Sequence, residues 1–122
     1  MALILVVDDE YSIAELLEAA LTDAGHEVVT AVDGRQGLER LRERRPDLVL
    51  LDFMMPIMDG AAVLKTLHSD PTRRDIPVVI MSSLPEGAVA ELARGLYVAF
   101  LRKPFKLAAV IELANTVLQH RS

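Results

Sequence analysis

The chain has 122 residues, of which 52% are hydrophobic and 25% are charged, and its net charge is -5. This length suits one domain with a sizeable core, and no apolar run is long enough to span a membrane. The absence of cysteine excludes disulfides and thiolate sites, and the acidic balance argues against a general nucleic-acid surface. The N-terminus does not resemble a signal peptide. We therefore expect one cytoplasmic domain over residues 1–122, with protein or cation partners and no direct contact with nucleic acid or membrane.

Short apolar runs alternate with segments of helical periodicity along the chain. The first run, 2–7, is too short for a helix and predicts a buried strand. Apolar residues then recur at helical spacing over 13–21, with Ser12 as the expected N-cap and Gly25 as the expected end. The elements predicted after these are a strand 26–31, a helix 35–44, a strand 47–51, a helix 60–68, a strand 77–81, a helix after Pro85 with Val89, Leu92, Ala93 and Leu96 on its apolar side, a strand 97–101 and a helix 107–118.

Five strand–helix pairs in strict alternation predict an α/β fold. Such a chain forms parallel strands joined by right-handed crossovers, with helices on both faces of one doubly wound sheet. Ligands bind to these sheets at the carboxyl ends of the strands, near the point where the strand order reverses. We therefore expect the functional site among the residues that follow the strands.

Those residues bring acidic, hydroxyl and ammonium groups to one edge of the predicted sheet. Asp8 and Asp9 follow the first strand, Asp52 the third, Ser82 the fourth and Lys103 the fifth. Without compensation the three carboxylates would repel one another and raise at least one pKa. A Mg²⁺ ion would remove this difficulty, because it binds one or two carboxylates and leaves room for water and phosphate oxygens. The lysine charge and the serine hydroxyl suit the same phosphate.

Four motifs resemble those of the receiver domain of two-component response regulators, in the same order and at similar spacing. They are VVDDE at 6–10, LLDFMMPIMDG at 50–60, PVVIMSS at 77–83 and FLRKPF at 100–105. The resemblance covers essentially the whole chain and is to single-domain, chemotaxis-regulator-like receivers. It implies a flavodoxin-like (βα)5 fold with strand order 2-1-3-4-5. It also implies a signalling switch that accepts and slowly loses its own phosphate, and not an enzyme acting on other substrates.

The resemblance also implies a role for each matching residue. Asp52 would be the phosphoacceptor, which attacks the phosphorus of a phosphohistidine on a sensor histidine kinase or phosphotransfer protein. Asp9 would bind Mg²⁺ directly and Asp8 mainly through water, together with the Asp52 carboxylate and the Met54 carbonyl oxygen. A carboxylate nucleophile divides phosphoryl relay into two easier steps, so the protein has mainly to position groups and neutralise charge.

Ser82 and Lys103 would contact the phosphoryl oxygens, and Ser82 and Phe100 would form the switch. In the family the hydroxyl moves toward the phosphate and an aromatic residue turns inward behind it. This remodels the face made by the fourth helix, fifth strand and fifth helix, which contacts a downstream protein target. Relatives commonly have tyrosine where this chain has Phe100, so coupling here would depend on packing; the alternative is that Phe100 is only a core residue. The dipeptide 103–104 resembles one that is often cis in the family.

Two apolar residues predict how long the phosphate would last. Met54 and Leu84 flank the phosphoryl group in this family, at the place where an attacking water enters. Neither side chain can orient that water for in-line attack. We therefore predict slow self-dephosphorylation.

Simpler interpretations exist for each residue taken singly. The aspartates and Ser82 could serve as helix caps or turn formers, and Lys103 could be a solvated lysine; the joint pattern favours the site. Glu10 is expected to be exposed without a role, and the arginines within 40–45 to form a salt-bridged helix face. Three histidines lack the spacing of a metal site and are expected at the surface: His26, His68 and His120.

Other functions fit the chain less well. A phosphatase of the haloacid dehalogenase type needs a second aspartate at the position of Met54, and a nucleotide-binding module needs a glycine-rich loop after the first strand. A phosphorylation-independent pseudo-receiver usually lacks the acidic pair, the acceptor or the lysine, all of which this chain has. Because the last predicted helix ends at the chain terminus, we expect a stand-alone receiver, as a monomer or weak dimer. A receiver excised from a longer hybrid kinase or regulator fits the same residues, and the cognate kinase and target are left open.

Overall fold

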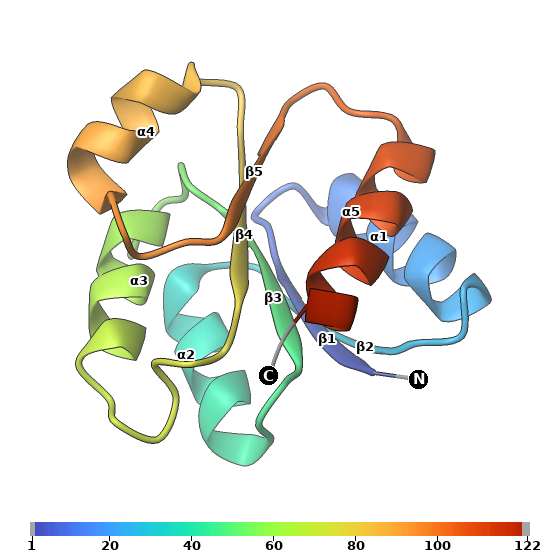
Figure 1. The fold of residues 1–122 in the computed structure, drawn as a ribbon, viewed down its shortest axis with the longest axis horizontal. Coiled ribbons are helices and arrows are strands. Elements are labelled where there is room, and N and C mark those ends of the chain that lie inside the picture. Colours follow the sequence, from blue (N-terminus) through green and yellow to red (C-terminus); the bar gives the residue numbers. More distant parts are fainter. Residues whose placement is uncertain (1, 121–122) are drawn as a thin grey trace.

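The computed structural model describes residues 2–120, which form a five-stranded parallel sheet covered by helices on both faces (Figure 1). The strands lie in the order β2-β1-β3-β4-β5, and all neighbouring pairs are parallel. The predicted class and strand order are therefore confirmed. The elements are β1 (Leu3–Val7), α1 (Tyr11–Asp23), β2 (Glu27–Ala31), α2 (Gly34–Glu43), β3 (Leu48–Asp52), α3 (Gly60–His68), β4 (Val78–Ser82), α4 (Glu86–Ala93), β5 (Ala99–Arg102) and α5 (Leu107–His120).

Each face of the sheet has its own hydrophobic core. Side chains alternate along a strand, so Leu5 and Val7 of β1 pack on the side of α2, α3 and α4, whereas Ile4 and Val6 pack on the side of α1 and α5 (Figure 1). Burial on both faces explains why the strands are continuously apolar in sequence. Among the described residues, no helix is both long and apolar enough to cross a membrane.

The start of α1 differs from the expectation that Ser12 is its N-cap. The helix begins at Tyr11, and Glu10 occupies the N-cap position with an extended backbone and, within the described residues, no side-chain capping bond. The reason lies just before the helix, where the Glu10 backbone N–H donates to Asp8 Oδ1 at 2.9 Å. This local turn starts the helix two residues earlier than the position where a serine cap would place it.

The elements near the fourth helix also differ from the sequence pattern. Strand β5 begins at Ala99 and not at Tyr97, and Val98 is 60% exposed in the loop before it. In α4, Val89 and Ala93 are buried, whereas Leu92 on the predicted apolar side is 60% exposed. This short helix covers the core with a narrow stripe, so apolar residues beside that stripe remain at the surface.

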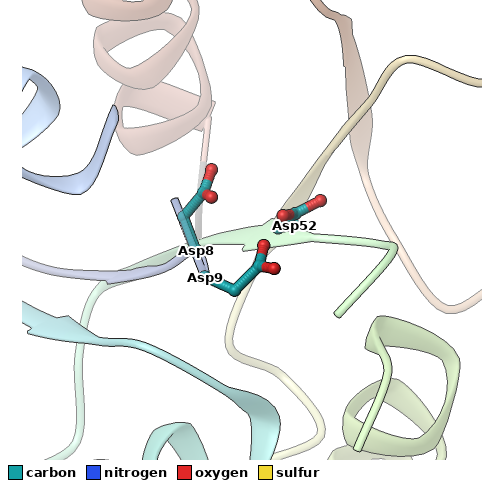
Figure 2. Close-up of side chains that lie close together, drawn as sticks. All are labelled: Asp8, Asp9 and Asp52. Atoms are coloured by element: carbon teal, nitrogen blue, oxygen red, sulfur yellow. The ribbon is translucent and has the colours of Figure 1, made fainter. Parts of the chain in front are cut away.

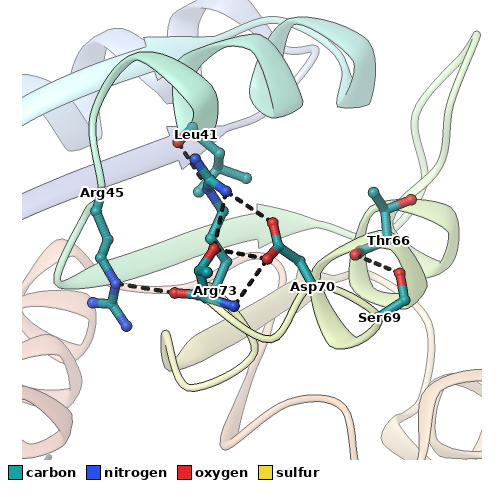
Figure 3. Close-up of polar contacts among 7 residues, drawn as sticks. Leu41, Arg45, Thr66, Ser69, Asp70 and Arg73 are labelled. Atoms are coloured by element: carbon teal, nitrogen blue, oxygen red, sulfur yellow. Dashed lines mark hydrogen bonds and ion pairs between the residues drawn. The ribbon is translucent and has the colours of Figure 1, made fainter.

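A polar network fixes the loop between α3 and β4 against the end of α2 (Figure 3). Asp70 accepts hydrogen bonds from the backbone and hydroxyl of Thr72 and pairs with Arg73, and these contacts lower the pKa of Asp70 to about 2. Arg73 Nε also donates to the carbonyl oxygen of Leu41 at 3.1 Å, and Arg45 Nε donates to that of Thr72 at 3.4 Å. These bonds lie where β4 begins, at the edge of the sheet opposite the strand ends that carry the acidic residues.

Replacing Gly60 with alanine is expected to destabilise the protein. A Cβ atom at Gly60 would lie 2.7 Å from the Phe53 Cα and 2.9 Å from the Asp52 carbonyl oxygen, and this backbone cannot move aside cheaply. We expect a loss of about 2 to 4 kcal/mol in the free energy of unfolding, measured by denaturant titration.

Gly87 in α4 provides the matched control. A Cβ atom there meets no atom within 4 Å among the described residues, and alanine favours a helix more than glycine does. Gly87→Ala is therefore expected to change stability by a gain of about 0.5 to 1 kcal/mol. Equal losses in the two variants would contradict the close approach at Gly60.

Candidate functional site

Three acidic side chains meet at the carboxyl edge of the sheet (Figure 2). Asp8 and Asp9 directly follow β1, and Asp52 is the last residue of the neighbouring strand β3. Val7 lies opposite Leu51 in the parallel register, so the residues that follow them in the chain are brought side by side. Each aspartate offers one carboxylate oxygen, and these three oxygens lie within 4.8 Å of one another.

Lys103 brings a positive charge to this cluster from the segment after β5. Its Nζ lies 3.0 Å from Asp8 Oδ2, 3.4 Å from Glu10 Oε1 and 3.5 Å from Asp52 Oδ2, and its side chain is only 12% exposed. Burial alone would lower the pKa of Lys103, but the hydrogen bond to Asp8 and the surrounding carboxylate charges outweigh it, so the pKa is raised. The ammonium therefore remains charged among its acidic neighbours.

The environment of Asp52 makes its ionised form costly. The residue is 4% exposed, and burial is the largest of the effects that raise its pKa to about 7. A hydrogen bond with Asp9 and the charge of Asp8 act in the same direction, against the charge of Lys103 and the Met54 N–H, which lies 3.3 Å from Asp52 Oδ1. Extra positive charge near this carboxylate would therefore favour the ionised form, which is the form that can act as a nucleophile.

The donor set at this edge fits a hard divalent cation such as Mg²⁺. Its three convergent atoms are carboxylate oxygens, and their combined charge exceeds what one ammonium neutralises. Asp8, Asp9 and Asp52 are the residues that would hold the ion. Met54 lies in the loop directly after β3, and the role of its carbonyl oxygen as a further ligand stays a prediction.

The two residues predicted to form the switch lie on neighbouring strands. Ser82 ends β4 beside β3, is 1% exposed, and its Oγ accepts a hydrogen bond from the Leu84 N–H at 3.0 Å. Phe100 lies on β5, partly buried against the core on the side of α4. Ser82 thus shares the edge of the acidic cluster, while Phe100 lies further along the sheet toward α4. The peptide bond between Lys103 and Pro104 is cis, as the sequence comparison with the family dipeptide suggested.

Glu10 is a neighbour of the site that the sequence did not single out. It is exposed as expected, but its carboxylate lies 3.4 Å from Lys103 Nζ. The two residues are 93 positions apart in the chain. In the sequence, Glu10 is marked only by its position directly after the acidic pair, and this position does not predict a contact with Lys103, which follows the fifth strand.

Comparison with known families agrees with this arrangement. The family model described as response regulator receiver domain matches residues 4–115. The chain belongs to this family. It is 36% identical over 121 residues to the transcriptional regulatory protein PrrA of Mycobacterium tuberculosis, covering 97% of this chain and 50% of that protein. It is 51% identical over 83 residues to the response regulator PleD of Caulobacter vibrioides, and this match covers 68% of this chain and 18% of PleD.

The receiver domain therefore spans half or less of the length of these curated relatives. Among solved structures, the chemotaxis protein CheY4 of Vibrio cholerae is similar with a TM-score of 0.90 and 29% identity, covering 96% of this chain and 98% of that one. NtrX of Brucella abortus is similar with a TM-score of 0.86 and 38% identity, and this match covers 97% of this chain and 27% of the NtrX chain. Similar receiver domains thus occur both as nearly whole chains and as parts of longer proteins.

We expect Mg²⁺ to raise the melting temperature of this receiver domain, because a ligand that binds the folded state stabilises it. Asp9→Asn should remove most of that increase and change the stability without Mg²⁺ only slightly, since Asp9 is exposed. Asp75→Asn, at an exposed aspartate outside the cluster, should leave the increase unchanged. Thermal denaturation with and without Mg²⁺ measures the melting temperature of each variant. If Mg²⁺ raised the melting temperatures of Asp9→Asn and Asp75→Asn equally, this result would contradict the metal site.

Proposed function

We propose that this receiver domain is a phosphoacceptor switch in a two-component pathway. Asp52 would accept the phosphoryl group of a phosphohistidine on a sensor histidine kinase or a phosphotransfer protein. The observation that carries the proposal is the convergence of Asp8, Asp9, Asp52 and Lys103 at one edge of the sheet. Membership of the receiver family supports it. The chain would act on its own carboxylate and not as an enzyme on other substrates.

The chemistry follows from the positions of these residues. An Asp52 carboxylate oxygen attacks phosphorus, an oxygen–phosphorus bond forms, and the bond between phosphorus and the histidine nitrogen breaks. Lys103 Nζ, 3.5 Å from Asp52 Oδ2, can donate to a phosphoryl oxygen, and the Ser82 hydroxyl lies at the same edge. When bound, Mg²⁺ supplies the positive charge that favours an ionised Asp52 and neutralises phosphoryl oxygens.

The output of the switch would be a change at the face formed by α4, β5 and α5. Ser82 would move toward the phosphate and Phe100 would repack behind it. Two exposed apolar side chains belong to the segments that make up this face, since Leu92 in α4 and Val98 in the loop before β5 are each 60% exposed.

Incubation with acetyl phosphate and Mg²⁺ tests the acceptor. Intact-mass measurement is expected to show one added phosphate on the wild type and none on Asp52→Asn. Asp59→Asn is the control, because Asp59 is an exposed aspartate that caps α3 through the Ala62 N–H, seven residues beyond the acceptor. That variant should still be phosphorylated. A wild type that gains no phosphate would favour a phosphorylation-independent pseudo-receiver.

The phosphate on Asp52 is expected to persist for minutes or longer. Met54 is 59% exposed and Leu84 is partly buried, and neither apolar side chain can hydrogen-bond an attacking water. Met54→Gln adds such a group and should shorten the half-life several-fold. The measurement is the decay of the phosphorylated mass in Mg²⁺ after the donor is removed; a half-life of seconds in the wild type would contradict the prediction.

A further inference from the structure

The ammonium of Lys103 is shared among carboxylates that would have different fates when the receiver is phosphorylated. Asp8 lies 3.0 Å from Nζ and is buried, and Asp52 lies 3.5 Å away and would itself carry the phosphate. Glu10 lies 3.4 Å away, but its side chain is 58% exposed and it lies outside the cluster of three aspartates. Glu10 is thus the contact that neither the metal cluster nor the acceptor requires.

The hydrogen bonds of Lys103 limit how freely its ammonium group can move toward a phosphate. An ammonium group carries three N–H donors, and two of them form hydrogen bonds here, to Asp8 Oδ2 at 3.0 Å and to Glu10 Oε1 at 3.4 Å. The contact with Asp52 Oδ2, at 3.5 Å, is an ion pair. When Nζ moves toward a phosphoryl oxygen on Asp52, the hydrogen bond to Glu10 is the one expected to lengthen, because it is longer and more exposed than the one to Asp8.

The backbone holds Glu10 where it can compete for this donor. The Glu10 N–H donates to Asp8 Oδ1 at 2.9 Å, which ties the residue to the acidic cluster. The position is the N-cap of α1, yet within the described residues its side chain makes no capping bond and reaches toward Lys103 instead. A residue with a shorter carboxylate, such as aspartate, would cap the helix here and leave the lysine.

We propose that Glu10 is a positioning residue that holds Lys103 away from the incoming phosphoryl group and so slows the phosphorylation of Asp52. This inference rests on the proposed function of Asp52 as the acceptor. With acetyl phosphate as the donor, an Asp52 oxygen–phosphorus bond forms, the bond between phosphorus and the acetate oxygen breaks, and acetate leaves. Glu10 takes no part in these bonds and acts only through Lys103.

The rate of phosphorylation by acetyl phosphate in Mg²⁺ tests this role. Glu10→Gln is expected to be about twofold to fivefold faster than the wild type, the factor that corresponds to an exposed ion pair. Glu18→Gln is the matched control: it removes the same charge from an exposed residue of α1 that lies about 12 Å further along the helix, and it should not change the rate. An unchanged or slower rate in Glu10→Gln would overturn the proposal.

Glu10→Asp separates the contact from the charge. This variant keeps the negative charge but shortens the side chain, so it should be as fast as Glu10→Gln if the contact with Lys103 is what slows the reaction. A rate equal to that of the wild type would mean that charge alone acts, and the proposal would fall. If the wild type is phosphorylated and the Glu10 variants react at the same rate as the wild type, only this inference is refuted. If neither the wild type nor any variant is phosphorylated, the proposed function itself is refuted.

Discussion

Replacing Lys103 with methionine is expected to lower the free energy of unfolding of the unphosphorylated protein by about 2 to 4 kcal/mol at pH 8 without Mg²⁺. The variant leaves the fully buried Asp8 and the nearly buried Asp52 without the ammonium that contacts both. The loss should shrink as the pH falls toward 6, because Asp52 can then take up a proton and relieve the repulsion. Denaturant titration across this pH range measures the effect.

A second lysine provides the control for this experiment. Lys106 is exposed and lies three residues further along the chain, so Lys106→Met removes the same charge from the surface and should change stability little. Lys103→Met should also accept phosphate from acetyl phosphate at least about tenfold more slowly, because it lacks a donor for the phosphoryl oxygens. Similar stability and rate in the two variants would show that Lys103 is an ordinary surface lysine.

Replacing Asp52 with asparagine is expected to change stability in the opposite direction. Burial, the hydrogen bond with Asp9 and the charge of Asp8 raise the pKa of Asp52 from 3.8 to about 7. A carboxyl group with a raised pKa in the folded state supports folding fully below about pH 4, and this support is lost as the pH rises through about 7. Asparagine cannot ionise, so the variant should be more stable than the wild type at pH 8, by on the order of 4 kcal/mol.

The pH dependence distinguishes this cause from better packing of the amide. The advantage of Asp52→Asn should be large at pH 8 without Mg²⁺ and small near pH 4, as followed by denaturant titration. Asp75→Asn, at an exposed aspartate, should show no such dependence. Mg²⁺ should reduce the advantage at pH 8, because it stabilises only the protein that has the full set of carboxylates. An advantage that is constant with pH would contradict the electrostatic explanation.

Periodicity and motif order were sufficient for the architecture. The runs that became β1, β3 and β4 are continuously apolar because both faces of a parallel sheet are covered, and this pattern is visible in one dimension. The same reasoning placed Asp8, Asp52 and Ser82 at one edge, since the carboxyl ends of parallel strands share an edge. This reasoning was wrong about the start of α1. Ser12 suits an N-cap by residue type, but the hydrogen bond between the Glu10 N–H and Asp8 makes a turn that starts the helix earlier.

The surface of the fourth helix shows a second limit of pattern reading. Leu92 has the spacing of a core residue and Val98 the character of a strand residue, yet both are exposed. Periodicity says which side of a helix is apolar, but the width of the stripe that becomes buried depends on how the helix is placed on the sheet. That placement results from packing between elements that are distant in the chain.

The electrostatic properties of the site could be determined only from the folded chain. Residue types predicted a carboxylate cluster, but only packing sets the burial that raises the pKa of Asp52 and the reach that brings Lys103 to Glu10 from 93 positions away. Interactions between charges depend on their separation in space and on the solvent removed around them. Residue order alone does not determine either of these quantities. It does determine the alternation of apolar runs and helical segments, from which the sheet could be predicted.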